Sequence, residues 1–226
     1  MSPKTQRRLG VVVCVGSGVF LALLGGLHSL RPDLDPSWRF ISEYARGDFG
    51  WLMSLAFAAL AVACLSGLWV FRQPAGGWPG RIGAVLLGIS SLGMLMAAVF
   101  VTDPINTPAD RLSLSGTLHS LGGGLNFTTL AVIALTLGLA RNERWQGSVA
   151  LLWALAGLGL LADLAFFIVS ASAAGDGFGP GNYTGLLGRI VMVSVAAWMI
   201  TAGAHAIRLA VVRDMLGRPV AGLERH

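Results

Sequence analysis

A chain of 226 residues of which 54% are hydrophobic and only 12% are charged is too apolar for a soluble domain of that length. The net charge of +5 does not indicate nucleic-acid binding, because the basic residues are spread over short loops and tails without a basic stripe. The composition therefore predicts an integral membrane protein with membrane lipids, and no nucleic acid, as partners.

Six apolar runs follow one another along the chain, and each is long enough to cross a hydrocarbon layer of about 30 Å. Because lipid offers no hydrogen-bond partner to free backbone groups, each run must be helical. The expected fold is all-α, with residues 1–226 forming a single domain, an integral membrane bundle of six transmembrane helices. The spans are predicted at about 9–31, 50–71, 82–101, 116–140, 148–172 and 185–209.

The basic residues are distributed unequally between the two sides of such a bundle. Eleven of the 16 Lys and Arg residues fall on the side of both termini, including Arg218 and Arg225, and five fall on the other side. The positive-inside rule therefore predicts a multi-pass protein of the plasma membrane with both termini in the cytoplasm.

Most of the ionisable side chains inside or at the mouths of the spans map to the outer side. A charge in hydrocarbon is costly, so such a set is a functional-site hypothesis. In the first outer connection, Asp35 as N-cap and Pro36 at the first helical position predict a short interfacial helix that carries Trp38. This helix would either anchor the second span or cover the polar set.

The fourth span carries polar and small residues on one helical face. They are His119, Gly122, Gly123, Asn126 and Thr129, spaced at i, i+3, i+4, i+7 and i+10. Either these residues form hydrogen bonds between helices, or another helix or a ligand approaches through the glycine gap and Asn126 binds substrate.

Asp163 in the fifth span and Arg189 in the sixth cannot comfortably face lipid. A buried ion pair between them is the simplest way to satisfy both charges. The pair would be either a structural contact or part of a substrate-binding site. Alternatively, Arg189 would hold an anionic head group through its planar guanidinium.

Two carboxylates and two imidazoles lie at the outer mouths of four different spans, namely Glu43, Asp103, His28 and His119. These four could bind a divalent metal, whose open position would activate water. They could equally supply a general acid and base without a metal. A third interpretation is a scatter of interfacial polar residues, since no local motif such as HExxH is present.

Three short motifs of this chain resemble those of a known family. They are Ser42-Glu43 before the second span, Asp103-Pro104 after the third, and Gly116-x-x-His119 at the start of the fourth. With the six spans, they are similar to a prokaryotic membrane family known as domain of unknown function 998. The resemblance covers most of the chain and implies no established catalytic residues, but its motifs contain three of the residues selected above on energetic grounds.

That family is in turn distantly similar in layout to Frag1/DRAM/Sfk1-type membrane proteins, some of which are linked to lipid remodelling or membrane lipid organisation. This second likeness concerns the fold and carries little weight for function.

Three functions remain open. The first is an enzyme or binding protein that acts on a lipid or other amphiphile at the outer interface. Its assigned residues are Glu43, Asp103 and His119 as catalytic groups and Arg189, Asn126 and Asp163 as substrate-binding groups. The second is a small-molecule or proton-coupled transporter, ranked lower because transporter sites usually involve broken helices near the midplane, whereas no proline interrupts a predicted span. The third is a non-catalytic scaffold.

Overall fold

The structure, a computed structural model, describes residues 1–216, and within them the side chains of all residues except 174–176. Arg218 and Arg225, which contribute to the predicted orientation, lie outside the described residues. In the described part, the regular structure is entirely helical, and six helices are long and apolar enough to cross a membrane. The predicted all-α fold with six transmembrane helices is therefore confirmed.

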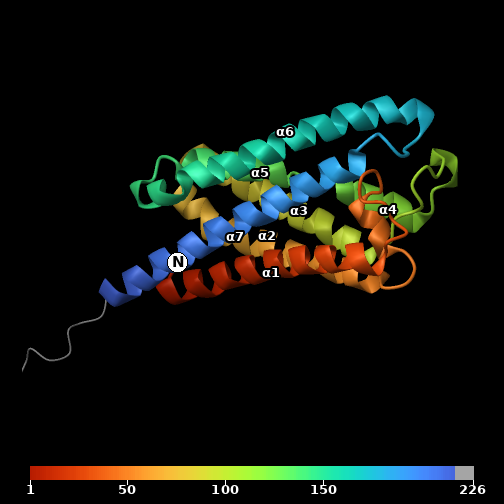
Figure 1. The fold of residues 1–226 in the computed structure, drawn as a ribbon. Helices are drawn as coiled ribbons and strands as arrows, with labels where there is room; N and C mark the ends of the chain where they lie inside the picture. The colour runs from red at the N-terminus through yellow and green to blue at the C-terminus, as the bar shows by residue number, and fades with distance from the viewer. Residues whose placement is uncertain (217–226) are drawn as a thin grey trace, which may run out of the picture.

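The long helices run back and forth along a common axis (Figure 1). They are α1 (Pro3–Leu30), α2 (Gly50–Ala75), α3 (Gly77–Val99), α4 (Leu114–Gly124), α5 (Thr128–Leu139), α6 (Gln146–Asp176) and α7 (Thr184–Leu216), and the short 3₁₀ helices are η1 (Ile41–Ala45), η2 (Ala109–Arg111) and η3 (Glu143–Trp145). The fourth span consists of α4 and α5 together. The start of α1 and the end of α7 lie at the same end of the bundle, which we call the terminal end; the opposite end is the distal end.

The helices extend beyond the predicted spans at the terminal end. α1 begins at Pro3 because the side chain of Ser2 accepts the backbone N–H of Thr5 at 3.2 Å and so caps the helix. α2 continues to Ala75 and ends at Gly76, whose φ of 59° favours glycine. Hydropathy therefore locates the apolar part of each helix, whereas capping residues determine where the helix ends.

The helices pack closely around an apolar core. α2 lies between α1 and α3, α7 packs on α1 and α6, and α6 covers one edge of the bundle (Figure 1). Trp198 of α7 is fully buried in this core, donates to the Thr136 hydroxyl at 2.8 Å and meets the Phe71 ring edge-on. These contacts join α2, α5 and α7 in the core.

The first distal connection differs from its prediction. The short helix η1 begins at Ile41, not at Pro36, and Asp35 instead accepts the backbone N–H of Ser37 at 2.8 Å within a turn. This turn supports the start of α7, where the Leu186 N–H donates to the Ser37 carbonyl at 2.9 Å. The connection is therefore packed onto α7.

Candidate functional site

Arg189 is the centre of a polar network at the distal end. It is buried on α7, and its Nε donates to His28 Nε2 of α1 at 2.8 Å. Its Nη1 donates to the carbonyl oxygens of Arg39 at 2.7 Å and Gly185 at 2.9 Å. Because His28 Nε2 accepts a hydrogen bond, the ring proton lies on Nδ1, which donates to the Leu24 carbonyl at 2.6 Å. The imidazole is therefore neutral in this arrangement.

Glu43 joins the same network from η1. Its side chain is only 2% exposed, and Oε1 accepts from Arg39 Nη1 at 2.9 Å and from the Ile105 N–H at 3.2 Å. The Tyr44 ring packs against both His28 and Arg189: its centroid lies 5.3 Å from the centroid of the His28 ring and 5.4 Å from the guanidinium carbon of Arg189. We call Arg39, Glu43, Tyr44, His28 and Arg189 the distal cluster.

Several buried polar atoms of the distal cluster have no hydrogen-bond partner. They are Arg39 Nε, Glu43 Oε2 and Arg189 Nη2. Leaving a buried polar atom unpaired costs about 1 to 3 kcal/mol, and more for a charged group. The cluster therefore presents two unused guanidinium donors and one unused carboxylate acceptor, a combination that requires explanation.

Aromatic side chains adjoin the distal cluster. Phe40, next to Arg39, packs edge-on against Phe178 with ring centroids 4.9 Å apart and lies 6.1 Å from Phe166 of α6. Phe178 belongs to the connection between α6 and α7. Hydrogen bonds of 2.7 and 2.8 Å between the Asn106 side chain and the Phe178 backbone join this connection to the loop between α3 and α4. The cluster thus lies beside an apolar surface held by three distal connections.

The exposed acids of the first connection hold its turns. Arg31 pairs with Asp33 at 2.7 Å and donates to the Arg46 carbonyl at 2.6 Å, so it joins the two ends of the connection. The hydrogen bond from Arg31 lowers the pKa of Asp33. The backbone N–H of Ser37 likewise lowers the pKa of Asp35.

Asp103 has a hydrogen-bond partner outside the distal cluster and holds the start of α4. Its Oδ2 accepts the Ser113 N–H at 2.8 Å and lies directly against Gly116, where a Cβ atom would overlap it. Two of the sequence motifs are thus in contact, because Gly116 leaves the space that the Asp103 carboxylate fills. This arrangement explains both residues structurally, and a catalytic role for Asp103 stays a prediction.

His119 is also engaged separately. It is buried on α4, its Nδ1 lies 2.7 Å from the Phe100 carbonyl, and its ring meets Phe57 at 6.1 Å. Within residues 1–216, no group of three or more His, Cys, Asp or Glu side chains is placed to hold a metal ion. The structure thus lends no support to the metal site predicted from His28, Glu43, Asp103 and His119, each of which has its own hydrogen-bond partner, and that site stays a prediction.

The predicted ion pair between Asp163 and Arg189 is wrong. The contacts of Phe166 with Gly188 and of Ser194 with Gly159 place the two residues at similar depth, yet the ion pairs within residues 1–216 do not join them. Backbone carbonyls and an imidazole satisfy the arginine instead, whereas Asp163 interacts with the Thr129 side chain on α5. The aspartate is thus a half-buried carboxyl near the middle of its span.

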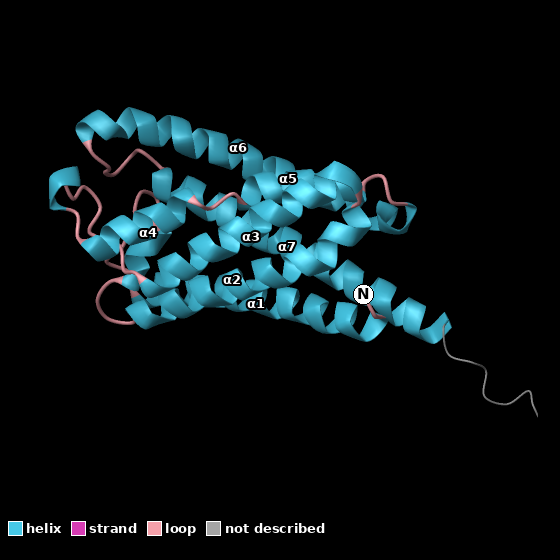
Figure 2. Ribbon diagram, turned by 180° about the vertical axis from the view of Figure 1, so that it is seen from behind, coloured by secondary structure: helices cyan, strands magenta, loops and turns pink. Residues whose placement is uncertain are grey.

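The fourth span is interrupted, which the sequence interpretation missed. α4 ends at Gly124 and α5 begins at Thr128 (Figure 2). Ser90 Oγ of α3 accepts the Phe127 N–H at 2.9 Å, and Asn126 Oδ1 accepts the Thr128 hydroxyl at 2.8 Å. Asn126 therefore bonds to the first residue of α5, whose N-cap is Phe127, and the predicted face does not continue past the break. The signal was a run of three glycines followed by Asn, since glycine weakens a helix and Asn caps one.

Arg39 and Tyr44 are members of the cluster that sequence reasoning did not select as site residues. The spacing of Arg39 and Glu43, four residues apart, was a signal for the ion pair that they form.

Comparison with known proteins places the chain in a group without an assigned activity. A family model described as "Protein of unknown function (DUF998)" matches residues 14–205, which include the distal cluster and the contact between Asp103 and Gly116. No curated protein and no solved structure matches the chain. The site must therefore be interpreted from its own chemistry.

Proposed function

The chain belongs to the DUF998 family, whose description states no function, and we propose that it binds the polar head group of a lipid or other amphiphile at the distal cluster. The positive-inside rule supports cytoplasmic termini in a plasma membrane, so the distal cluster would face the outer leaflet.

The unpartnered buried atoms carry this proposal. An acidic head group, such as a phosphate or carboxylate, would accept hydrogen bonds from Arg39 Nε and Arg189 Nη2. A hydroxyl or ammonium hydrogen of the same head group would donate to Glu43 Oε2. The preferred ligand therefore combines acid oxygens with a hydrogen-bond donor, as phosphoglycerol and phosphoethanolamine head groups do.

The neighbouring aromatic surface supports an amphiphile over a small soluble anion. Phe40 and Phe166 flank the cluster, and the next residue on α6, Phe167, is 64% exposed on the outside of the bundle. An apolar tail would lie along this face of α6. Since the unpartnered atoms are buried, binding requires that the residues covering them move aside.

Binding is favoured over catalysis by the hydrogen bonds of the predicted catalytic groups. Asp103 and His119 each bond to a backbone group, and both have partners different from those of Glu43.

The proposal is tested by measuring the lipids that remain bound to purified protein, by native mass spectrometry and by extraction. Wild type is expected to retain a phosphoglycerol or phosphoethanolamine lipid, whereas Arg39→Lys with Arg189→Lys, which keeps the charge but removes the planar fork, should lose most of it. Arg111→Lys, at an exposed position of the same end, is the matched control and should retain the lipid. Equal retention by all three proteins would overturn the proposal.

A second candidate function, proton-coupled transport, is supported by the interruption of the fourth span. Transporter sites commonly use discontinuous helices near the midplane, and Asp163 lies beside Thr129 in the first turn of α5. A membrane-permeant carbodiimide, which modifies protonated carboxyl groups in lipid, should label Asp163 and not the Asp163→Asn variant. Absence of label on Asp163 in wild-type protein would count against this candidate.

A further inference from the structure

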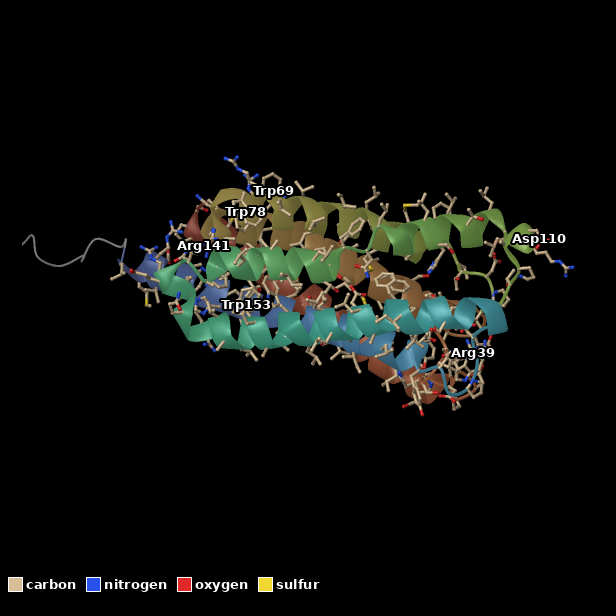
Figure 3. All side chains as sticks on the ribbon, turned by 90° about the horizontal axis from the view of Figure 1, so that it is seen from above. Arg39, Trp69, Trp78, Asp110, Arg141 and Trp153 are labelled. Carbon is tan, nitrogen blue, oxygen red and sulfur yellow. The ribbon has the colours of Figure 1, made fainter. Side chains whose placement is uncertain are left out.

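A groove at the terminal end carries a second, independent inference. It has a volume of about 1180 Å³ and lies between the start of α1, the end of α2 and the start of α3. Residues that line it include Leu9, Leu68, Trp69, Arg72, Arg81 and Val85. Trp69 lies at the end of the bundle opposite to Arg39 (Figure 3), so the groove is separate from the distal cluster.

The polar part of the groove is strongly basic. Arg72 stacks on the Trp69 ring, with the guanidinium carbon 4.6 Å from the ring centroid, so its position is fixed while its N–H edge stays available. Arg72 and Arg81 are both exposed. The ion pairs formed within residues 1–216 involve arginines of the distal end. The two guanidinium groups in the groove thus face no carboxylate partner in the described chain.

The rest of the groove is apolar and faces outward. Leu68 and Leu9 are partly buried, and Val85 is 60% exposed. Trp69 is itself about half exposed, and aromatic rings at this depth favour the boundary between head groups and hydrocarbon. A basic pocket that continues into an apolar wall matches a molecule with an anionic head and hydrocarbon chains.

We infer that this groove binds an anionic phospholipid of the leaflet at the terminal end, with its phosphate between Arg72 and Arg81 and its chains along Leu68 and Val85. Planar guanidinium groups match phosphate oxygens in pairs. A free phosphate would leave the apolar wall of the groove exposed to water, so the lipid is the better occupant. The inference does not depend on the distal cluster, since the two sites share no residue.

The test compares two double variants of the full chain in detergent, titrated with phosphatidylglycerol or phosphatidylcholine and analysed by native mass spectrometry. Arg72→Gln with Arg81→Gln removes the groove charges. Arg141→Gln with Arg208→Gln removes the same number of exposed charges elsewhere at the terminal end. All four positions are exposed, so the variants should fold, and unchanged thermal midpoints check this.

Wild type is expected to prefer phosphatidylglycerol over phosphatidylcholine, and the Arg72→Gln, Arg81→Gln variant should bind phosphatidylglycerol about 30-fold more weakly. Each arginine contributes about 1 kcal/mol to the attraction, and about 1.4 kcal/mol corresponds to a tenfold change in affinity. The control variant should bind as wild type does. The inference is overturned if both variants lose affinity equally, which would indicate general attraction to a basic surface. It is also overturned if phosphatidylcholine binds equally well, or if the groove variant is unaffected.

Discussion

Replacement of Gly116 by Ala tests whether the contact between two sequence motifs is structural. A Cβ atom at this position would overlap Asp103 Oδ2 and lie 2.5 Å from Asp103 Cγ. Forcing one methyl group into a filled site costs about 1 to 3 kcal/mol. If the carboxylate turns away to make room, it also loses its bond to the Ser113 N–H, at about 1.5 to 3 kcal/mol for a charged acceptor. With both costs, Gly116→Ala should reduce the free energy of unfolding by about 2.5 to 6 kcal/mol.

A double-mutant cycle gives this prediction its sharpest form. Asp103→Ala alone should destabilise through the lost bond to Ser113. In that background Gly116→Ala should cost little, because the overlapping carboxylate is absent, the remaining neighbour is the backbone N of residue 103 at 3.1 Å, and Ala favours a helix by about 1 kcal/mol over Gly. Gly123→Ala on the same helix, with no neighbouring atom within 4 Å of its Cβ position, is the control. Unfolding by a denaturing detergent from mixed micelles measures the differences. Additive costs, or a Gly116→Ala protein as stable as the Gly123→Ala protein, would refute the reasoning.

Two further predictions concern helix packing and pH. Gly138→Ala should destabilise by about 1 to 3 kcal/mol, since its Cβ would overlap the Ala75 carbonyl oxygen, whereas Gly157→Ala, with no atom within 4 Å, should be neutral or slightly stabilising in the same unfolding assay. Because Arg31 lowers the pKa of Asp33, the pair contributes stability above about pH 4, and this stability is lost as the pH falls through the lowered pKa. The thermal midpoints of wild type and of Asp33→Asn should therefore differ at about pH 7 and converge at low pH. A difference that stays constant with pH would contradict this prediction.

The positions of the spans could be predicted from the sequence because a membrane helix needs a long apolar run, whatever its neighbours. The ends could not, since they depend on individual caps such as Ser2 and Gly76. The interruption at Asn126 was also out of reach of hydropathy, because the break lies within an apolar run and the Ser90 hydroxyl that stabilises it comes from another helix.

The partners of the charged residues were harder to predict than the residues themselves. The cost of burying a charge correctly indicated that Arg189 needs acceptors. It did not indicate which acceptors, because a backbone carbonyl or an imidazole nitrogen accepts a hydrogen bond as a carboxylate does. Depth did not decide between Asp163 and His28, because α6 and α7 pack with Asp163 and Arg189 at similar depth. The side chains differ in direction: Asp163 interacts with Thr129 on α5, whereas Arg189 donates to His28 on α1.

The cost of placing a polar group in an apolar setting therefore selects residues of two kinds. Their hydrogen bonds show which kind each residue belongs to. Asp103 and His119 are costly in an apolar setting, but each has a backbone partner that accounts for its presence through the fold. Glu43 and Arg189 also have partners, yet each retains a buried atom that the fold does not satisfy. A purely structural arrangement would have no reason to keep such atoms where an apolar side chain would fit at lower cost. The unsatisfied atoms are thus the strongest argument that the distal cluster binds a ligand, and Asp103 and His119 need no ligand to explain them.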